Sequence, residues 1–350
     1  MDPLKIDTVK LSDAGDALVI IDQTLLPNEV RYLSLTAIKD IWEAIRALRV
    51  RGAPAIGVAA AFGAYLAAYY APDAELEGRF LAACDYLATS RPTAVNLFWA
   101  LDRMRAAYGR VKALPPADIR AALRAEAQAV MDEDIEISRS IGRYGLSLLR
   151  PGMGILTHCN AGTLATAKYG TALAPVYAAI ERGLPGLRVY CDETRPLLQG
   201  ARLSAFEMVS AGVDTTLLCD NMASSLMKSG KVDIIFVGCD RVARNGDAAN
   251  KIGTSGVAIL AAHYGIPFYV CAPSSTIDGA NASGADIPIE FRPPEEVTEL
   301  WYEKRMAPEG VGVYNPAFDV TDAGLITGII TERGLVRAPY EEGFRALGLV

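Results

Sequence analysis

Short apolar runs alternate with helix-length amphipathic stretches through the second half of the chain. Runs of this length, rich in β-branched residues, are typical of strands buried in a parallel sheet. We predict strands at residues 154–158, 187–191, 215–219, 234–238, 268–272 and 288–291. We predict helices between them at residues 162–180, 198–211, 222–229 and 255–264. This alternation predicts an α/β fold with a doubly wound parallel sheet.

The first half of the chain has a different pattern. Apolar residues spaced i, i+3, i+4 predict helices over 38–48 and 118–149, and the alanine-rich stretch 57–70 predicts a buried helix. Two short runs, at 9–11 and 17–21, predict an antiparallel strand pair. The change of pattern indicates two domains. Residues 1–145 form a small, mostly helical domain with the strand pair, and residues 146–350 form the domain of the parallel sheet.

Composition narrows the class of protein. The chain has 350 residues, 51% of them hydrophobic, and a net charge of −7, which argues against a nucleic-acid-binding role. The start of the chain does not resemble a signal peptide, and the longest apolar run is too short to cross a bilayer, so no membrane partner is expected. Six cysteines are spread singly, a pattern typical of reduced thiols in a cytoplasmic protein. With only two histidines, a multi-histidine metal site is excluded.

Two candidate catalytic residues follow predicted strands. Cys159 follows the 154–158 strand and precedes a predicted helix, whose amino terminus would stabilise a thiolate acting as base or nucleophile. A buried packing role for Cys159 is the alternative. Asp240 follows the 234–238 strand, where open α/β sheets place their ligand crevice. If apolar neighbours wall it, the pKa of Asp240 should rise and it could act as a general acid; a helix or turn cap is the alternative.

Several turns could hold an anion. Lys251 lies in a segment rich in Gly, Asn and Asp after Asp240, and Arg51 and Arg91 each precede a predicted helix start. Gln199, with Arg202, falls near the next strand end. The first strand of the sheet is not followed by the Gly-x-Gly-x-x-Gly fingerprint. The interpretation as a dinucleotide-dependent dehydrogenase therefore loses its main support.

Six motifs together carry a resemblance to a known family. They are Arg51-Gly52-Ala53-Pro54-Ala55-Ile56-Gly57, Arg91-Pro92-Thr93-Ala94-Val95-Asn96, Thr157-His158-Cys159-Asn160-Ala161-Gly162, Glu193-Thr194-Arg195-Pro196, Gly238-Cys239-Asp240-Arg241 and Asn250-Lys251-Ile252-Gly253-Thr254. In this order and spacing they resemble the methylthioribose-1-phosphate isomerases, in a superfamily that also contains the alpha, beta and delta subunits of initiation factor 2B. The similarity extends over nearly the whole chain.

The resemblance implies an aldose–ketose isomerase of methionine salvage, acting on S-methyl-5-thio-ribose 1-phosphate, with a helical domain beside a Rossmann-like domain. It implies Cys159 and Asp240 as the catalytic pair. It also implies a set of residues that hold the substrate: Arg51, Gly52, Ala53, Arg91, Gln199, Asn250 and Lys251. A small sugar phosphate is the expected partner, no metal or nucleotide cofactor is expected, and the chain is expected to form a homodimer through the Rossmann-like domain.

Some alternatives stay open on the sequence. Related isomerases act on 5-deoxyribose 1-phosphate or ribose 1,5-bisphosphate, and the pocket around the sugar C5 group distinguishes them. A regulatory, ligand-sensing subunit like those of initiation factor 2B is the non-enzymatic alternative. Hydrogen transfer from C2 to C1 could proceed through an enolate with Cys159 as base or by a direct hydride shift.

Overall fold

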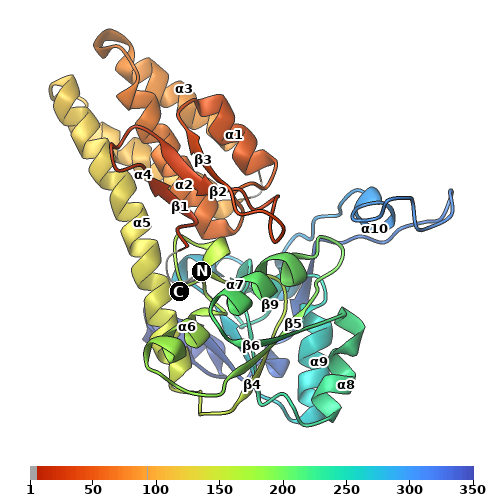
Figure 1. Cartoon of the computed structure of the whole chain (residues 1–350). Helices are drawn as coiled ribbons and strands as arrows, with labels where there is room; N and C mark the ends of the chain where they lie inside the picture. The colour runs from red at the N-terminus through yellow and green to blue at the C-terminus, as the bar shows by residue number, and fades with distance from the viewer. Residues whose placement is uncertain (1–5, 93) are drawn as a thin grey trace. The chain divides into compact units, whose positions relative to one another are not determined.

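The computed structural model describes residues 6–92 and 94–350 (Figure 1). Contacts divide these residues into two compact units. One unit contains the chain up to Ser138 together with Gly162–Gly170, and the other contains Arg139–Ala161 together with Thr171–Val350. The predicted division at residue 145 stays a prediction, and Thr93 of the Arg91–Asn96 motif lies outside the described residues. Among the described helices, none combines the length and apolar character needed to cross a membrane.

The first unit is built around a buried helix. Its antiparallel sheet has the order β1 (Val9–Leu11), β2 (Leu18–Ile21) and β3 (Tyr32–Leu35), so the predicted pair gains a third strand. Its helices are α1 (Ile38–Arg46), α2 (Ala53–Tyr69), α3 (Leu76–Ala88), α4 (Val95–Val111) and the first part of α5 (Pro116–Leu146). Helix α2 is apolar on all sides because it lies in the middle of the unit's core. Its alanines and glycines allow the neighbouring helices to approach closely.

The second unit contains the predicted doubly wound sheet. Its strands are β4 (Gly154–Thr157), β5 (Arg188–Asp192), β6 (Asp214–Leu218), β7 (Ile234–Val237), β10 (Phe268–Cys271), β13 (Gly328–Thr331) and β14 (Gly334–Val336). Their order is β14-β13-β10-β7-β4-β5-β6, and only β14 runs antiparallel to its neighbour. After β4 the chain adds β5 and β6 on one side of it. It then returns to the other side of β4 and adds β7, β10 and β13. The α/β fold class is therefore confirmed, and the order reverses between β4 and β7.

A second, smaller sheet follows Asp240. It has the order β11 (Ile277–Asp278), β8 (Arg241–Ala243), β9 (Ala248–Lys251) and β12 (Phe318–Thr321). The Gly- and Asn-rich segment after Asp240 is thus the hairpin β8–β9. The strand predicted at 288–291 is wrong, because Phe291 makes only an isolated bridge to Pro316.

The second unit also contains helices. They are the end of α5 together with α6 (Ala174–Glu181), α7 (Ala205–Ser210), α8 (Ala223–Lys228), α9 (Thr254–Tyr264), α10 (Glu295–Thr298) and α11 (Tyr340–Ala346). Helices α8 and α9 lie side by side (Figure 1). The helix predicted over 198–211 is present, but it begins with a π-helical turn at Gly200–Ser204.

The single helix predicted over 162–180 is wrong. Only a 3-10 turn at Thr163–Ala165 and then α6 are helical there. Side chains from elsewhere in the first unit donate hydrogen bonds to backbone carbonyls of this segment. The Thr8 hydroxyl donates to the Thr163 carbonyl at 2.6 Å, and the Gln23 amide donates to the Leu164 carbonyl at 2.8 Å. These carbonyls are therefore not available to an α-helical ladder.

Candidate active site

Cys159 and Asp240 lie at the switch point of the large sheet. Strands β4 and β7 are parallel neighbours, with Leu156 opposite Ile235. Cys159 comes two residues after β4, and Asp240 comes three residues after β7. The two strand-end turns touch, since a Cβ atom added at Gly238 would lie 2.7 Å from the Cβ of Ala161. The carboxyl ends of strands at a switch point are where open α/β sheets bind ligands.

The Cys159 turn is held by polar contacts rather than by a helix. Cys159 is 9% exposed and has a φ of 68°, a left-handed conformation that is uncommon for a residue with a side chain. Its N–H donates to the Thr194 hydroxyl at 2.8 Å, and its carbonyl accepts from the Ser204 hydroxyl at 2.7 Å. The Gln199 amide donates to the Cys159 sulfur at 3.4 Å. The helix expected directly after Cys159 is absent, so Gln199 is the polar group that faces the thiol.

Asp240 has a more open environment. Its N–H donates to the Ala249 carbonyl at 2.9 Å, which joins the end of β7 to the β8–β9 hairpin. The residue is exposed. The apolar wall considered from the sequence does not surround this carboxyl group. Its exposure leaves it accessible to a bound substrate.

Asn250 and Lys251 are the last two residues of β9. The buried Asn250 amide donates to the Thr254 hydroxyl at 3.0 Å, and the Lys251 ammonium lies 3.1 Å from the Ala317 carbonyl and 3.9 Å from the centre of the Phe318 ring. These contacts fix both side chains close to the start of α9. The end of β9 therefore presents an amide and a cation near Cys159, because the carbonyl of the next residue, Ile252, contacts His158.

His158 joins the two functional loops. Its Nδ1 lies 3.0 Å from a carboxylate oxygen of Asp192, at the end of β5, and its Nε2 lies 2.8 Å from the Ile252 carbonyl. Burial lowers the pKa of His158, but the hydrogen bond to Asp192 and the negative charges of Asp192 and Asp220 outweigh it and raise the pKa to about 9. The imidazole is therefore charged at neutral pH. Sequence reasoning missed this pair, although His158 adjoins Cys159.

A buried carboxylate lies behind the Cys159 turn. Glu207 of α7 accepts from the Asn160 amide at 2.9 Å and from the Tyr177 hydroxyl at 2.9 Å. The Asn160 amide also lies 3.2 Å from the Ser204 hydroxyl. All four side chains are buried, so this network fixes the backbone that carries Cys159. It too was missed, because nothing local in the sequence pairs these residues.

The same region contains three potential metal-ligating groups. Ligand atoms of His158, Asp192 and Asp220 lie within 4.8 Å of one another. Both ring nitrogens of His158 already contact acceptors, and the two oxygens of Asp220 accept the N–H groups of Thr194 and Arg195 at 2.7 Å. These hydrogen bonds account for the cluster, and the donor set fits a metal ion poorly.

Four further predicted site residues belong to the first unit. Helix α2 begins at Ala53, with Gly52 as its N-cap at a φ of 90°. Only glycine fits there, because a Cβ atom would lie 2.3 Å from the Ala165 carbonyl oxygen. Arg51 precedes this turn, and Arg91 lies between α3 and α4. Their part in the site, like that of the other predicted site residues, stays a prediction.

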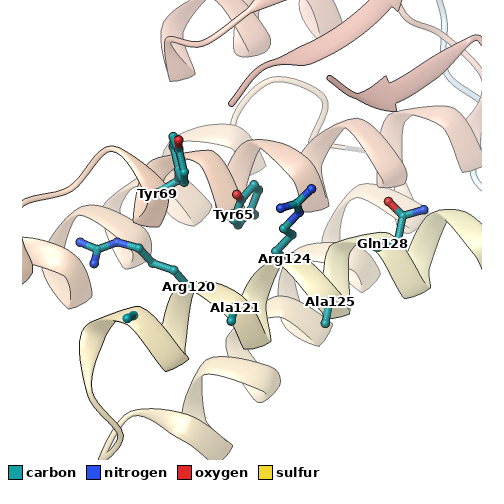
Figure 2. A pocket seen from close by; sticks show the side chains of 8 residues that line it. Tyr65, Tyr69, Arg120, Ala121, Arg124, Ala125 and Gln128 are labelled. Carbon is teal, nitrogen blue, oxygen red and sulfur yellow. The ribbon is translucent and has the colours of Figure 1, made fainter. Parts of the chain in front are cut away.

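A separate hollow of about 600 Å³ lies on the first unit between α2 and α5 (Figure 2). Figure 2 shows Tyr65 and Tyr69 of α2 on one side of it and Arg120, Arg124 and Gln128 of α5 on the other. Arg120 donates to the carbonyls of Ala68 and Ala71 at the end of α2. Its guanidinium thus caps the end of that helix. None of the predicted site residues lines this hollow.

The fold defines an α/β protein with polar strand-end groups at the switch point of its large sheet. A model of the initiation factor 2 subunit family matches residues 49–338. A Symbiobacterium thermophilum protein named methylthioribose-1-phosphate isomerase is 66% identical over 348 residues, covering 99% of this chain and 97% of that protein. A Petrotoga mobilis protein named 5-deoxyribose 1-phosphate isomerase is 57% identical over 342 residues, covering 97% and 98%.

A solved structure agrees with these relatives. The 5-methylthioribose 1-phosphate isomerase from Pyrococcus horikoshii superposes with a TM-score of 0.94 at 44% identity, covering 99% of this chain and 97% of that one. The chain belongs to the initiation factor 2 subunit family. Within that family it is an isomerase, which confirms the resemblance and the prediction of an enzyme.

Proposed function

We propose that the protein is an aldose–ketose isomerase that converts S-methyl-5-thio-α-D-ribose 1-phosphate to S-methyl-5-thio-D-ribulose 1-phosphate in methionine salvage. One observation carries the proposal. A thiol and a carboxyl group follow adjacent parallel strands at the switch point, in turns that touch through Ala161 and Gly238. The names of the two curated relatives support the class of substrate.

Asp240 is the general acid in this proposal. A sugar phosphorylated at its anomeric carbon has no free hydroxyl there, so the ring cannot open spontaneously to an aldehyde. A proton must reach the ring oxygen as its bond to C1 breaks. Asp240 is accessible at the strand end and is hydrogen-bonded through its backbone to β9, so its side chain can face a sugar bound at this edge.

Cys159 assists the hydrogen transfer. In one route its thiolate removes the C2 proton, and a proton then adds to C1 of the enol while the C2 hydroxyl loses its proton. In the other route hydride moves directly from C2 to C1 while the C2 hydroxyl loses its proton. The amide N–H that Gln199 directs at the sulfur favours negative charge there. Substrate deuterated at C2 separates the routes, because only the enolate route exchanges the label with water.

The remaining predicted residues hold the substrate. Gln199 is buried, and its Oε1 atom has no hydrogen-bond partner among the described residues, so it can accept from a sugar hydroxyl. Asn250 and Lys251 supply donors for the phosphate from the end of β9. In the proposal Arg51, Gly52, Ala53 and Arg91 complete the phosphate site with a guanidinium-rich helix start.

A 5-deoxyribose 1-phosphate isomerase is the second candidate. The Petrotoga mobilis relative with this name supports it, at 57% identity over 97% of the chain. Both sugars have an apolar substituent at C5, so the same catalytic groups serve either one. The two activities differ only in the room and apolar contact that the site gives to the methylthio group.

We also infer that the active form is a homodimer that pairs through the second unit. Strand β6 is an edge of the large sheet, and Leu217 on it is 50% exposed. Val209 and Met222, on the elements that flank β6, are 63% and 51% exposed. Such an edge favours association. Sedimentation velocity should show a dimer for the wild type and a monomer for Leu217→Asp.

An isomerisation assay of purified protein tests the function. We expect conversion of one or both 5-substituted ribose 1-phosphates to the ketose without added nucleotide. Asp240→Asn and Cys159→Ser should each lower kcat by about 10²-fold or more. Cys219→Ser and Asp118→Asn, at exposed positions, are the matched controls and should keep wild-type rates. A wild-type protein that converts neither sugar would refute the proposal.

A further inference from the structure

The buried His158–Asp192 pair connects two parts of the active site that lie far apart in the sequence. His158 is 1% exposed and Asp192 is fully buried. We propose that this pair is a positioning unit, which holds the Cys159 turn and the Asn250–Gly253 loop in one arrangement. The inference rests on the function proposed above. It assigns neither His158 nor Asp192 to the chemical step.

The geometry of the ring determines how many protons the pair holds. The Ile252 carbonyl can only accept, so the Nε2 atom of His158, 2.8 Å away, must carry hydrogen. The Asp192 oxygen lies 3.0 Å from Nδ1, and a hydrogen bond there needs one further proton between the two groups. With that proton on the ring, His158 is an imidazolium that donates from both nitrogens.

One end of the pair reaches the Cys159 turn. The Thr194 hydroxyl donates to the Asp192 backbone carbonyl at 3.1 Å. The oxygen of that hydroxyl also accepts the Cys159 N–H at 2.8 Å. Cys159 is also bonded covalently to His158. A displacement of Asp192 would therefore shift the backbone of the catalytic cysteine.

The other end of the pair reaches the substrate-binding loop. The Ile252 carbonyl that accepts from His158 directly follows Lys251. Gly253 lies against the imidazole, since an added Cβ would come within 2.8 Å of Cε1. Asp319 fixes the same loop by accepting the N–H groups of Gly253 and Ser255 at 2.8 and 3.2 Å.

Negative charge surrounds the imidazole. The charged and titratable groups that face His158 are Asp192, Asp220 and Asp319 from three other elements, and Cys159 from its own turn. Burial lowers the pKa of His158, but the hydrogen bond and charge of Asp192, with Asp220 and Cys159, raise it to about 9, against 6.5 for an ordinary histidine. The stabilisation that the charged imidazole gives to the folded state is therefore fully present below about pH 6.5 and is lost as the pH rises through about 9.

Two substitutions separate the ends of the pair. His158→Gln places an amide near Nε2 and can still donate to Ile252, but it leaves Asp192 without its partner. His158→Asn reaches Asp192 and loses Ile252. We expect His158→Gln to lower kcat about 10- to 100-fold with KM within about threefold, and His158→Asn mainly to raise KM, because misplacements of about 1 Å can cost about 10²-fold. His263→Gln, at an exposed histidine, is the control.

The pH profile gives a readout that a packing role would not change. Wild-type kcat/KM should fall as the pH rises through about 9. The double variant His158→Gln with Asp192→Asn has no titratable member of the pair, so this fall should be absent. It should also recover part of the kcat lost in His158→Gln, because no unpaired carboxylate remains buried. A double variant with wild-type kcat, KM and pH profile would overturn the proposal.

A spectroscopic test does not depend on activity. The chain has two histidines, so nitrogen-15 NMR of the ligand-free wild type resolves His158 by comparison with the His263→Gln variant. We expect both ring nitrogens of His158 to be protonated at pH 7 and to titrate near pH 9. A ring with one proton at pH 7 would overturn the ion pair. A wild type that turns over neither sugar but shows this titration would refute the function and leave the ion pair standing.

Discussion

Substitution of Gly253 by alanine tests how tightly the turn between β9 and α9 packs against His158. Gly253 has a φ of 101°, and an added Cβ would lie 2.8 Å from Cε1 and 2.9 Å from Nε2 of the imidazole. An alanine at position 253 therefore destabilises the folded state in two ways. Its backbone must stay left-handed, and its Cβ would contact the His158 ring, which hydrogen bonds hold from both sides.

The magnitude follows from these two penalties. A left-handed conformation costs a residue with a side chain roughly 1–2 kcal/mol. Overpacking a site that cannot yield costs about 1–3 kcal/mol more. Gly253→Ala should therefore reduce the free energy of unfolding by about 2–5 kcal/mol. Moving the Ile252 carbonyl off the imidazole should also lower kcat/KM about tenfold or more.

Two other glycines of the same helix provide matched controls. Gly265, the C-cap of α9, has a φ of 67° and no atom within 4 Å of an added Cβ, so Gly265→Ala shows the backbone penalty alone. Gly256, inside α9, has no such neighbour and no left-handed φ, so Gly256→Ala should stabilise by about 0.5–1 kcal/mol. Neither control should change kcat/KM.

Urea unfolding and steady-state kinetics of the three variants provide the measurement. The difference between Gly253→Ala and Gly265→Ala isolates the contact with His158. If Gly253→Ala were no more destabilising than Gly265→Ala and kept wild-type kcat/KM, the close approach of this loop to the imidazole would be refuted.

Three further predictions concern the surroundings of the site. Lys251→Ala should raise KM about tenfold or more with kcat little changed, whereas Lys228→Ala, at an exposed position, should change neither; equal KM values for both would contradict the phosphate role. Glu207→Ala leaves two buried donors unpaired and should cost about 2–6 kcal/mol in thermal unfolding, whereas Glu207→Gln retains an acceptor and a donor and should cost less. Burial raises the pKa of Asp134 to about 7 against the hydrogen bond from the Ala167 amide, so ionisation opposes folding increasingly as the pH rises from 3.8 through 7. Asp134→Asn should thus be more stable than the wild type at pH 8, with a smaller gain at pH 5; an equal gain at both would show that Asp134 does not titrate there.

The strands of the large sheet were predictable because each one is an uninterrupted buried run. In β4 and β7 every residue is buried, so a continuous apolar segment identifies them without any periodicity. Their topology then predicts that residues after their carboxyl ends meet at one edge. This strand-end position was one reason to select Cys159 and Asp240; the resemblance to the isomerases was the other.

The contacts that shape the site could not be predicted in this way. His158 pairs with a carboxylate 34 residues away and with a carbonyl 94 residues away. The helix expected after Cys159 failed for the same reason, since side chains of Thr8 and Gln23, more than a hundred residues earlier, bind the carbonyls that the helix would use. Local propensity does not report such tertiary competition.

A crystal structure of the Asp240→Asn variant with bound methylthioribose 1-phosphate tests the central claim most directly. The account predicts that the ring oxygen lies about 2.6–3.2 Å from the side chain at position 240, with C2 of the sugar facing the Cys159 sulfur. The phosphate should contact Lys251 at the end of β9. A sugar bound away from the switch point, with neither side chain near its C1–C2 bond, would contradict the account.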